Sequence, residues 1–140
     1  MNVVVVGSRE WSGEQATNQV NELLAMLKQK YSGLVVVTSS TDKGVGRIVR
    51  DRCLKDKTSF QFVDIHVRVF AQLPRTKLAQ VFFARNAALD EIGEEFHVFV
   101  DTSRKGAFED LIEKVKSTDD RLGQRRPLFE YLPQAQVKES

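Results

Sequence analysis

The chain has 140 residues, of which 41% are hydrophobic and 29% charged, and this composition fits one globular domain with a solvated surface. Its formal net charge of +2 is too small by itself to indicate a nucleic-acid-binding protein. The single cysteine, Cys53, excludes an internal disulfide, and no apolar run approaches the ~18 residues needed to span a membrane. Because the N-terminus also lacks the pattern of a signal peptide, we expect a cytoplasmic protein with no membrane partner.

The N-terminal stretch begins with four consecutive valines, Val3 to Val6, which predict a strand buried on both faces of a parallel sheet. A polar turn containing two glycines follows. Ser12 and Gln15 have the spacing of a capping box, so we expect a helix to begin at Ser12. A buried strand, a glycine turn and a helix N-terminus form a corner where backbone N–H groups can hold an anion.

The rest of the chain alternates between strands and helices. Apolar residues at helical spacing predict helices over residues 14–30, 45–53, 78–92 and 107–116, and short apolar runs predict strands over residues 34–38, 61–67, 96–100 and 128–132. The strand at 61–67 is the least apolar and is expected near an edge. This order predicts an α/β fold, a three-layer Rossmann-like sandwich with a mainly parallel sheet of four or five strands and helices on both faces. We expect one domain over residues 1–132 and a polar tail over 133–140.

Three of the predicted strands are followed by turns rich in small and polar residues, at residues 7–13, 39–46 and 101–106. The carboxyl ends of parallel strands share one edge of the sheet, and ligands of open α/β sheets bind there. We therefore expect the three turns to converge on one binding site.

The order of these motifs resembles the SLOG superfamily of small Rossmann-like domains. The similarity covers residues 2–116 and rests on Gly7-Ser8-Arg9, on Lys43-Gly44-Val45 and on Ala84-Arg85-Asn86. The superfamily includes the DNA-processing protein A, the LONELY GUY phosphoribohydrolases, molybdenum-cofactor carrier-like proteins, and stand-alone bacterial and phage domains. The resemblance implies a nucleotide or nucleotide-derived ligand.

Carried over by position, the resemblance implies a set of ligand-binding residues. These are Gly7, Ser8, Arg9, Ser39, Gly44, Arg85, Asn86, Thr102, Ser103 and Gly106. Trp11 in the first turn is a further candidate, because an indole can stack on a base, although it can equally pack on the helix behind it. Two departures matter: Ser39-Ser40 replaces a glycine pair, and Glu109 and Asp110 lie only near the place of the phosphoribohydrolase acid, which leaves them as candidates for catalysis.

Three functions therefore stay open. The leading one is binding of a nucleotide or nucleotide-derived small molecule; the others are a phosphoribohydrolase-like reaction, and an interaction or assembly module that keeps the fold without the ligand. No cofactor is implied, and the two histidines and Cys53 lack metal-ligand spacing, so we expect no metal site. A homo-oligomer remains an alternative. We interpret the basic cluster of Arg121, Arg125 and Arg126 as a solvated connection, with nucleic-acid contact the less favoured reading.

Overall fold

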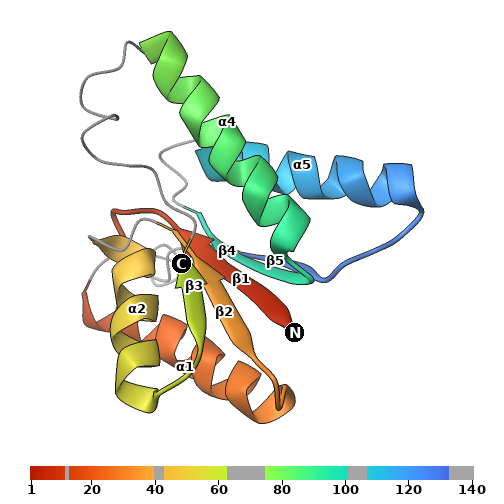
Figure 1. Ribbon diagram of the computed structural model, residues 1–140. Coiled ribbons are helices and arrows are strands. Elements are labelled where there is room, and N and C mark those ends of the chain that lie inside the picture. The colour runs from red at the N-terminus through yellow and green to blue at the C-terminus, as the bar shows by residue number, and fades with distance from the viewer. Residues whose placement is uncertain (12, 40–42, 63–74, 101–106, 133–140) are drawn as a thin grey trace, which may run out of the picture.

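The computed structural model describes residues 1–11, 13–39, 43–62, 75–100 and 107–132. The elements in chain order are β1 (Asn2–Gly7), α1 (Glu14–Lys30), β2 (Val35–Thr38), α2 (Gly44–Asp56), β3 (Phe60–Phe62), α4 (Arg75–Ile92), β4 (Glu95–Phe99), α5 (Ala107–Leu122) and β5 (Leu128–Tyr131) (Figure 1). All five strands are parallel and lie in the order β3-β2-β1-β4-β5. The predicted Rossmann-like fold is confirmed. Within the described ranges, no helix has both the length and the apolar character needed to cross a bilayer.

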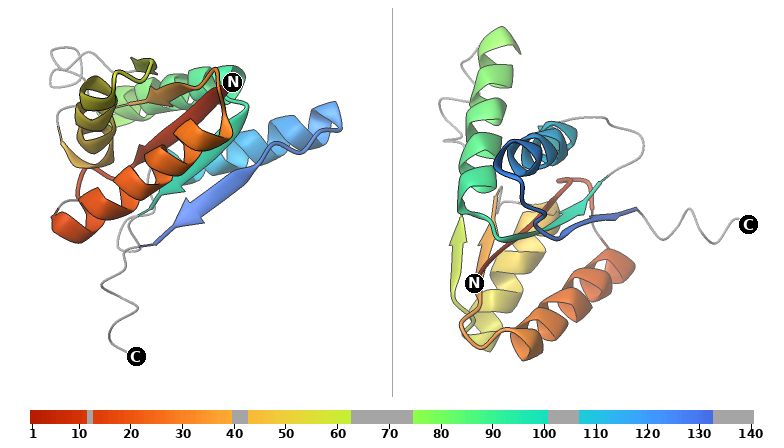
Figure 2. Two further views of the ribbon diagram at one scale, coloured as in Figure 1. Left: turned by 90° about the horizontal axis from the view of Figure 1, so that it is seen from below. Right: turned by 90° about the vertical axis from the view of Figure 1, so that its right-hand side faces the viewer.

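The protein has one hydrophobic core on each face of the sheet, and the valines of β1 lie at the centre of both. Val3 and Val5 pack with the residues of α1 and α2, whereas Val4 and Val6 pack with those of α4 and α5. Because successive side chains of a strand point to opposite faces, a continuous apolar run is what a strand covered on both sides requires. Figure 2 shows the two helical layers on either side of the sheet.

The direction in which strands are added to the sheet reverses between β1 and β4. The chain runs outward from β1 to β2 and β3, and then returns to pair β4 with the other side of β1. Ligands of open α/β sheets bind outside the carboxyl ends of the strands at such a reversal. In this chain those ends lead into Ser8, Ser39 and Val100.

Several predicted boundaries differ from the observed ones. The N-cap of α1 is Gly13 and not Ser12, because the backbone there has φ +92°, a conformation that glycine adopts without strain. Helix α4 begins three residues earlier than expected, at Arg75, and β3 begins at Phe60 on the sheet edge, as expected, while the remainder of the predicted 61–67 strand lies outside the described residues after Phe62.

Helix α5 is longer than predicted and ends at Leu122 rather than residue 116. Residues 117–121 are polar, so their sequence does not show the apolar stripe of a packed helix. The helix ends where Gly123 adopts φ +64°, the left-handed conformation that commonly follows a helix C-terminus.

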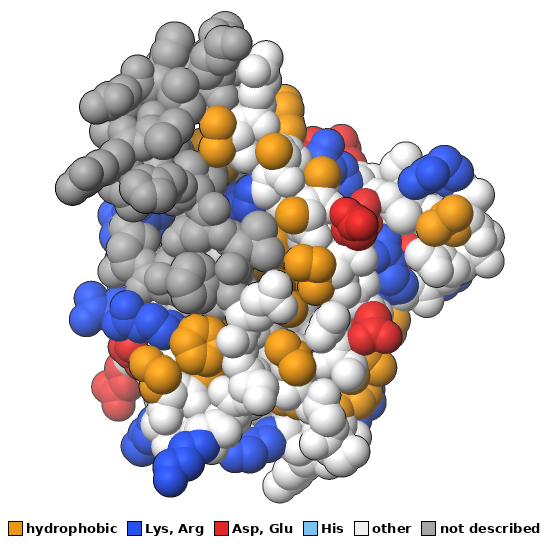
Figure 3. Space-filling view, viewed as in Figure 1, with side chains coloured by type: hydrophobic (Ala, Val, Ile, Leu, Met, Phe, Trp, Pro, Cys, Tyr) orange, Lys and Arg blue, Asp and Glu red, His pale blue; other side chains and the backbone are white. Residues whose placement is uncertain are grey.

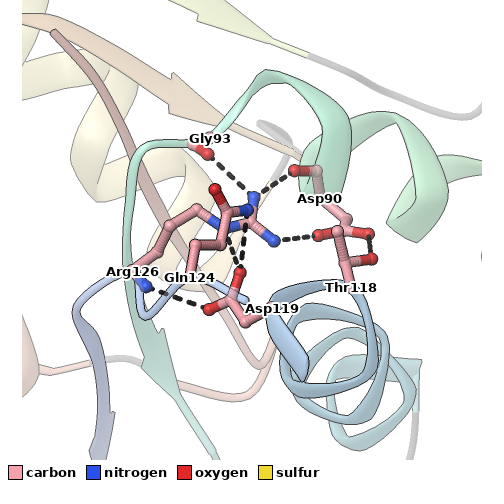
Figure 4. A network of polar contacts seen from close by, with 6 residues as sticks. All are labelled: Asp90, Gly93, Thr118, Asp119, Gln124 and Arg126. Atoms are coloured by element: carbon pink, nitrogen blue, oxygen red, sulfur yellow. Dashed lines mark hydrogen bonds and ion pairs between the residues drawn. The ribbon is translucent and has the colours of Figure 1, made fainter. Parts of the chain in front are cut away.

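The prediction that Arg126 is solvated is wrong. Its side chain is only 13% exposed and lies in a polar network. The guanidinium donates to Asp90 Oδ1 at 2.5 Å and to Asp119 Oδ1 at 2.7 Å, and it stacks 4.8 Å from the ring centre of Phe96. Burial opposes ionisation of Asp119, but the hydrogen bonds and charge of Arg126 lower the pKa of that carboxyl below its usual value. The network consists of Asp90, Gly93, Thr118, Asp119, Gln124 and Arg126 (Figure 4). It joins the C-terminal ends of α4 and α5 to the start of β5.

Candidate functional site

The turn after β1 is joined by hydrogen bonds to its neighbours at the carboxyl edge. Ser8 N donates to Phe99 O at 3.0 Å, and Ser8 O accepts from Trp11 N and Val45 N, each at 3.3 Å. A Cβ on Gly7 would lie 2.6 Å from Phe99 O, so only glycine allows β1 to pass this close to β4. The turn therefore connects β1, β4 and α2, and the Ser8 hydroxyl accepts from Glu10 N at 3.0 Å.

Trp11 packs into the protein at the end of β4. Its side chain is buried, its ring meets that of Phe99 edge-on at 5.1 Å, and its Nε1 donates to Val100 O at 3.3 Å. Trp11 was expected either to stack on a base or to pack on the protein, and these contacts are those of a packing residue. The same residue also forms one end of a groove described below.

Helix α2 begins in direct contact with the first turn. Gly44 has φ +71°, and a Cβ on it would lie 2.4 Å from Arg9 Cα and 2.5 Å from Ser8 O. The N-cap residue is Lys43, and its own side chain makes no capping hydrogen bond. The positive end of the α2 dipole therefore lies at the carboxyl edge of the sheet, next to the turn after β1.

We expect Gly44→Ala to lower the free energy of unfolding by about 2–3 kcal/mol, because the new methyl group is both strained and overlapped by backbone. Gly123→Ala is the matched control, since Gly123 has a similar φ of +64° with no atom within 4 Å of its Cβ position. Chemical denaturation measures both changes. Equal losses in the two variants would show that close packing at Gly44 adds nothing to the cost of the backbone conformation.

A groove of about 480 Å³ lies between α1 and α2 and opens at this end of the sheet. Trp11 and Gly44 lie at its start, and α1 contributes Gly13, Thr17 and Asn21. This volume falls within the ~300–1,000 Å³ that small-molecule sites occupy. The groove brings together two predicted site residues, Trp11 and Gly44, and adds residues that sequence reasoning missed.

Helix α2 makes the groove basic. Its lining contains Lys43, Arg47, Arg52 and Lys55 with one carboxylate, Asp51. The ion pairs of Lys43 with Glu10 and of Arg47 with Asp51 are both 3.7 Å long, and these four side chains are half or more exposed. Such pairs are weak and leave the cations able to contact an anion. Figure 3 shows Lys and Arg side chains gathered at the lower left, where α2 lies in Figure 1.

Arg85 and Asn86 lie between α4 and α5, on the opposite face of the sheet from the groove. Arg85 is 5% exposed and its guanidinium lies 5.1 Å and 4.6 Å from the ring centres of Phe82 and Phe108. It donates to Asn86 Oδ1, and Asn86 Nδ2 donates to Asp110 Oδ2 at 3.1 Å. The predicted pair is thus placed in a contact between helices.

The remaining predicted residues divide between exposed, buried and undescribed positions. Arg9 and Glu109 are exposed, and Asp110 pairs with Lys114 at 3.5 Å as well as with Asn86. The buried hydroxyl of Ser39, at the end of β2, has no hydrogen-bond partner in the part of the chain that the structure describes. Thr102, Ser103 and Gly106 lie outside the described residues.

A second polar cluster lies within the sheet, on the α1 side of β4. Tyr31 O–H donates to Glu95 Oε1, His97 Nε2 lies 2.6 Å from Glu95 Oε2, and Tyr131 O–H lies 2.7 Å from His97 Nδ1. A carboxylate, a neutral imidazole protonated on Nε2 and two phenols satisfy all three hydrogen bonds. Sequence reasoning missed the pair of Glu95 and His97, although two residues of a strand separated by one position share a face.

The residues of this second cluster have shifted pKa values with clear physical causes. Burial lowers the pKa of His97 and outweighs the nearby Glu95 carboxylate, which raises it. Burial raises the pKa of Glu95, but the hydrogen bonds from Tyr31 and His97 prevail and lower it. Burial and the Glu95 charge raise the pKa of Tyr131. The cluster therefore holds an ionised Glu95 beside a neutral His97 at neutral pH.

The chain matches no family model, and no curated protein or solved structure matches it either. The fold places the protein in the Rossmann-like α/β class, with a basic groove beginning at the carboxyl edge of the sheet.

Proposed function

We propose that the protein binds a nucleotide or nucleotide-derived small molecule, and that the α1–α2 groove is its site. The observation that carries this proposal is the position of the groove: it begins at the N-terminus of α2, beside Trp11. A helix N-terminus and nearby cations are the standard environment for a phosphate. The motifs Gly7-Ser8-Arg9 and Lys43-Gly44-Val45, which resemble those of the SLOG superfamily, flank the same point.

In this proposal the two ends of a nucleotide meet different chemistry. A phosphate lies at the first turn of α2, where Lys43 and Arg47 neutralise its charge. The sugar or base contacts the apolar surface formed by Trp11 and Ile48. Thr17 on α1 also lines the groove, with its hydroxyl donating to Gly13 O at 2.9 Å.

Isothermal titration calorimetry with a panel of nucleoside mono-, di- and triphosphates, cyclic nucleotides and ADP-ribose tests the proposal. At least one member is expected to bind, and Arg47→Ala is expected to weaken it about 10-fold or more, as loss of a hydrogen bond to a charged group does. Arg121→Ala is the matched control, because Arg121 is an exposed cation on α5, on the other face of the sheet. Folded protein that gives no heat with any member contradicts the proposal.

The interaction-module alternative has one observation in its favour. Trp11 and Arg85, two predicted ligand contacts, are buried against other parts of the protein. A fold that uses such residues for packing does not need a ligand to order them. Absence of nucleotide binding, together with concentration-dependent self-association in sedimentation experiments, would favour this alternative over ligand binding.

A further inference from the structure

β5 forms one edge of the sheet, and no described strand lies beyond it (Figure 2). Its ladder with β4 pairs Leu128 with Phe96, and Phe96 N donates to Pro127 O at 2.9 Å. In this parallel pattern the odd-numbered residues of β5 form the hydrogen bonds to β4. The backbone N–H and C=O groups of Leu128 and Glu130 therefore point outward, where a further strand can pair with them.

The side chains at this edge are largely apolar. Residues 128–132 contain one charged residue, Glu130, and neither lysine nor proline. Phe129 stacks on His97 with the ring centres 4.9 Å apart, yet Phe129 is 47% exposed, and Leu132 is 54% exposed. Natural proteins protect free sheet edges with lysine, proline or a bulge, so an edge of this composition favours pairing with another strand.

A second copy of β5 fits this edge in one register. A two-fold axis perpendicular to the sheet brings two β5 strands together antiparallel, with equivalent faces on the same side. With the axis at Phe129, Leu128 of each copy pairs with Glu130 of the other through the outward N–H and C=O groups. The two Phe129 side chains then lie opposite each other at a position without hydrogen bonds, where side chains approach most closely. With the axis at Glu130, two carboxylates would face each other, which is unfavourable.

We infer that the protein forms a homodimer in which two β5 strands pair antiparallel about Phe129, so that the two five-stranded sheets become one continuous sheet. The edge pairs with a copy of itself and not with a flexible peptide, because both strands are already extended and their pairing orders few additional residues. No residue of β5 lines the α1–α2 groove, so the dimer and the proposed nucleotide site are independent.

Sedimentation velocity over a range of protein concentrations tests this inference, with circular dichroism to show that each variant is folded. The unaltered chain is expected to form a concentration-dependent dimer. Phe129→Lys and Phe129→Asp, each measured alone, are expected to weaken the dimer about 30-fold or more, as loss of a central aromatic contact does. An equal mixture of the two variants is expected to dimerise again, because a lysine then faces an aspartate across the axis.

Glu130→Pro tests the backbone pairing separately from the side chains. It removes an N–H group that points away from β4, and proline is tolerated at such a position of an edge strand. The fold is expected to persist while the dimer weakens about 10-fold or more, because each copy then leaves one carbonyl oxygen of the other without a donor. A folded variant that dimerises as tightly as the unaltered chain overturns the inference.

Phe83→Asp is the matched control, because Phe83 on α4 is 45% exposed, almost as much as Phe129, and lies outside β5. It is expected to leave the dimer unchanged, as is removal of residues 133–140. The inference is overturned by a monomer at all concentrations, by a dimer that persists in Phe129→Lys, by a mixture that stays monomeric, or by a dimer lost with residues 133–140. None of these results bears on nucleotide binding, which calorimetry measures separately.

Discussion

Replacing Arg126 with alanine is expected to lower the free energy of unfolding by about 3–5 kcal/mol, as removal of one partner from a buried ion pair does. The guanidinium donates to the carboxylates of Asp90 and Asp119 and to the backbone oxygen of Gly93, and all three charged side chains are largely buried. Without it, two carboxylates remain near each other with too few donors. Urea denaturation followed by circular dichroism measures the loss.

Two further variants distinguish the stability contributed by the contacts of the network from the effect of removing a positive charge. Arg125→Ala removes the same charge from the neighbouring exposed position and is expected to change stability by no more than about 0.5 kcal/mol. Arg126→Lys keeps a cation but cannot reach both carboxylates and the backbone oxygens with one planar group, so an intermediate loss is expected. If Arg126→Ala were as stable as Arg125→Ala, the contacts of the network would make no net contribution to the free energy of unfolding.

Acid is expected to destabilise the protein from about pH 6.5 downward, because folding keeps His97 neutral. Since the pKa of His97 is lower in the folded state than its ordinary value of 6.5, the unfolded chain binds a proton first as the pH falls. The stability contributed by neutral His97 is complete above pH 6.5 and is lost below it, at up to about 1.4 kcal/mol per pH unit. Glu95, whose pKa is also lowered, adds a loss in the same direction below its ordinary value of 4.5.

Denaturation at several pH values between 7.5 and 5, compared across two variants, assigns this dependence. His97→Gln keeps a donor and an acceptor but does not titrate, so the slope below pH 6.5 is expected to disappear. His66→Gln replaces the only other histidine of the chain and is expected to leave the slope in place. The reverse pattern, with the slope lost in His66→Gln, would show that the Glu95–His97 pair is not its origin.

The sequence by itself determined the class of fold. Four successive β-branched valines favour a strand covered on both faces, and the apolar spacing in residues 14–30 fits a helix packed on one side. These patterns are local, because they depend on the period of a strand or a helix. Because the carboxyl ends of parallel strands share one edge, the sequence also placed the ends of β1, β2 and β4 together. Gly7, Ser39 and the turn that leads into α1 therefore lie at that edge.

The tertiary structure alone decided which polar residues act together. Arg126 was predicted to be solvated, and only the meeting of α4, α5 and β5 encloses it with Asp90 and Asp119. Likewise, the charges of α2 were visible in the sequence, but they line a groove only because α1 lies beside that helix. Pairing of this kind depends on contacts between residues far apart in the chain, which no local period encodes.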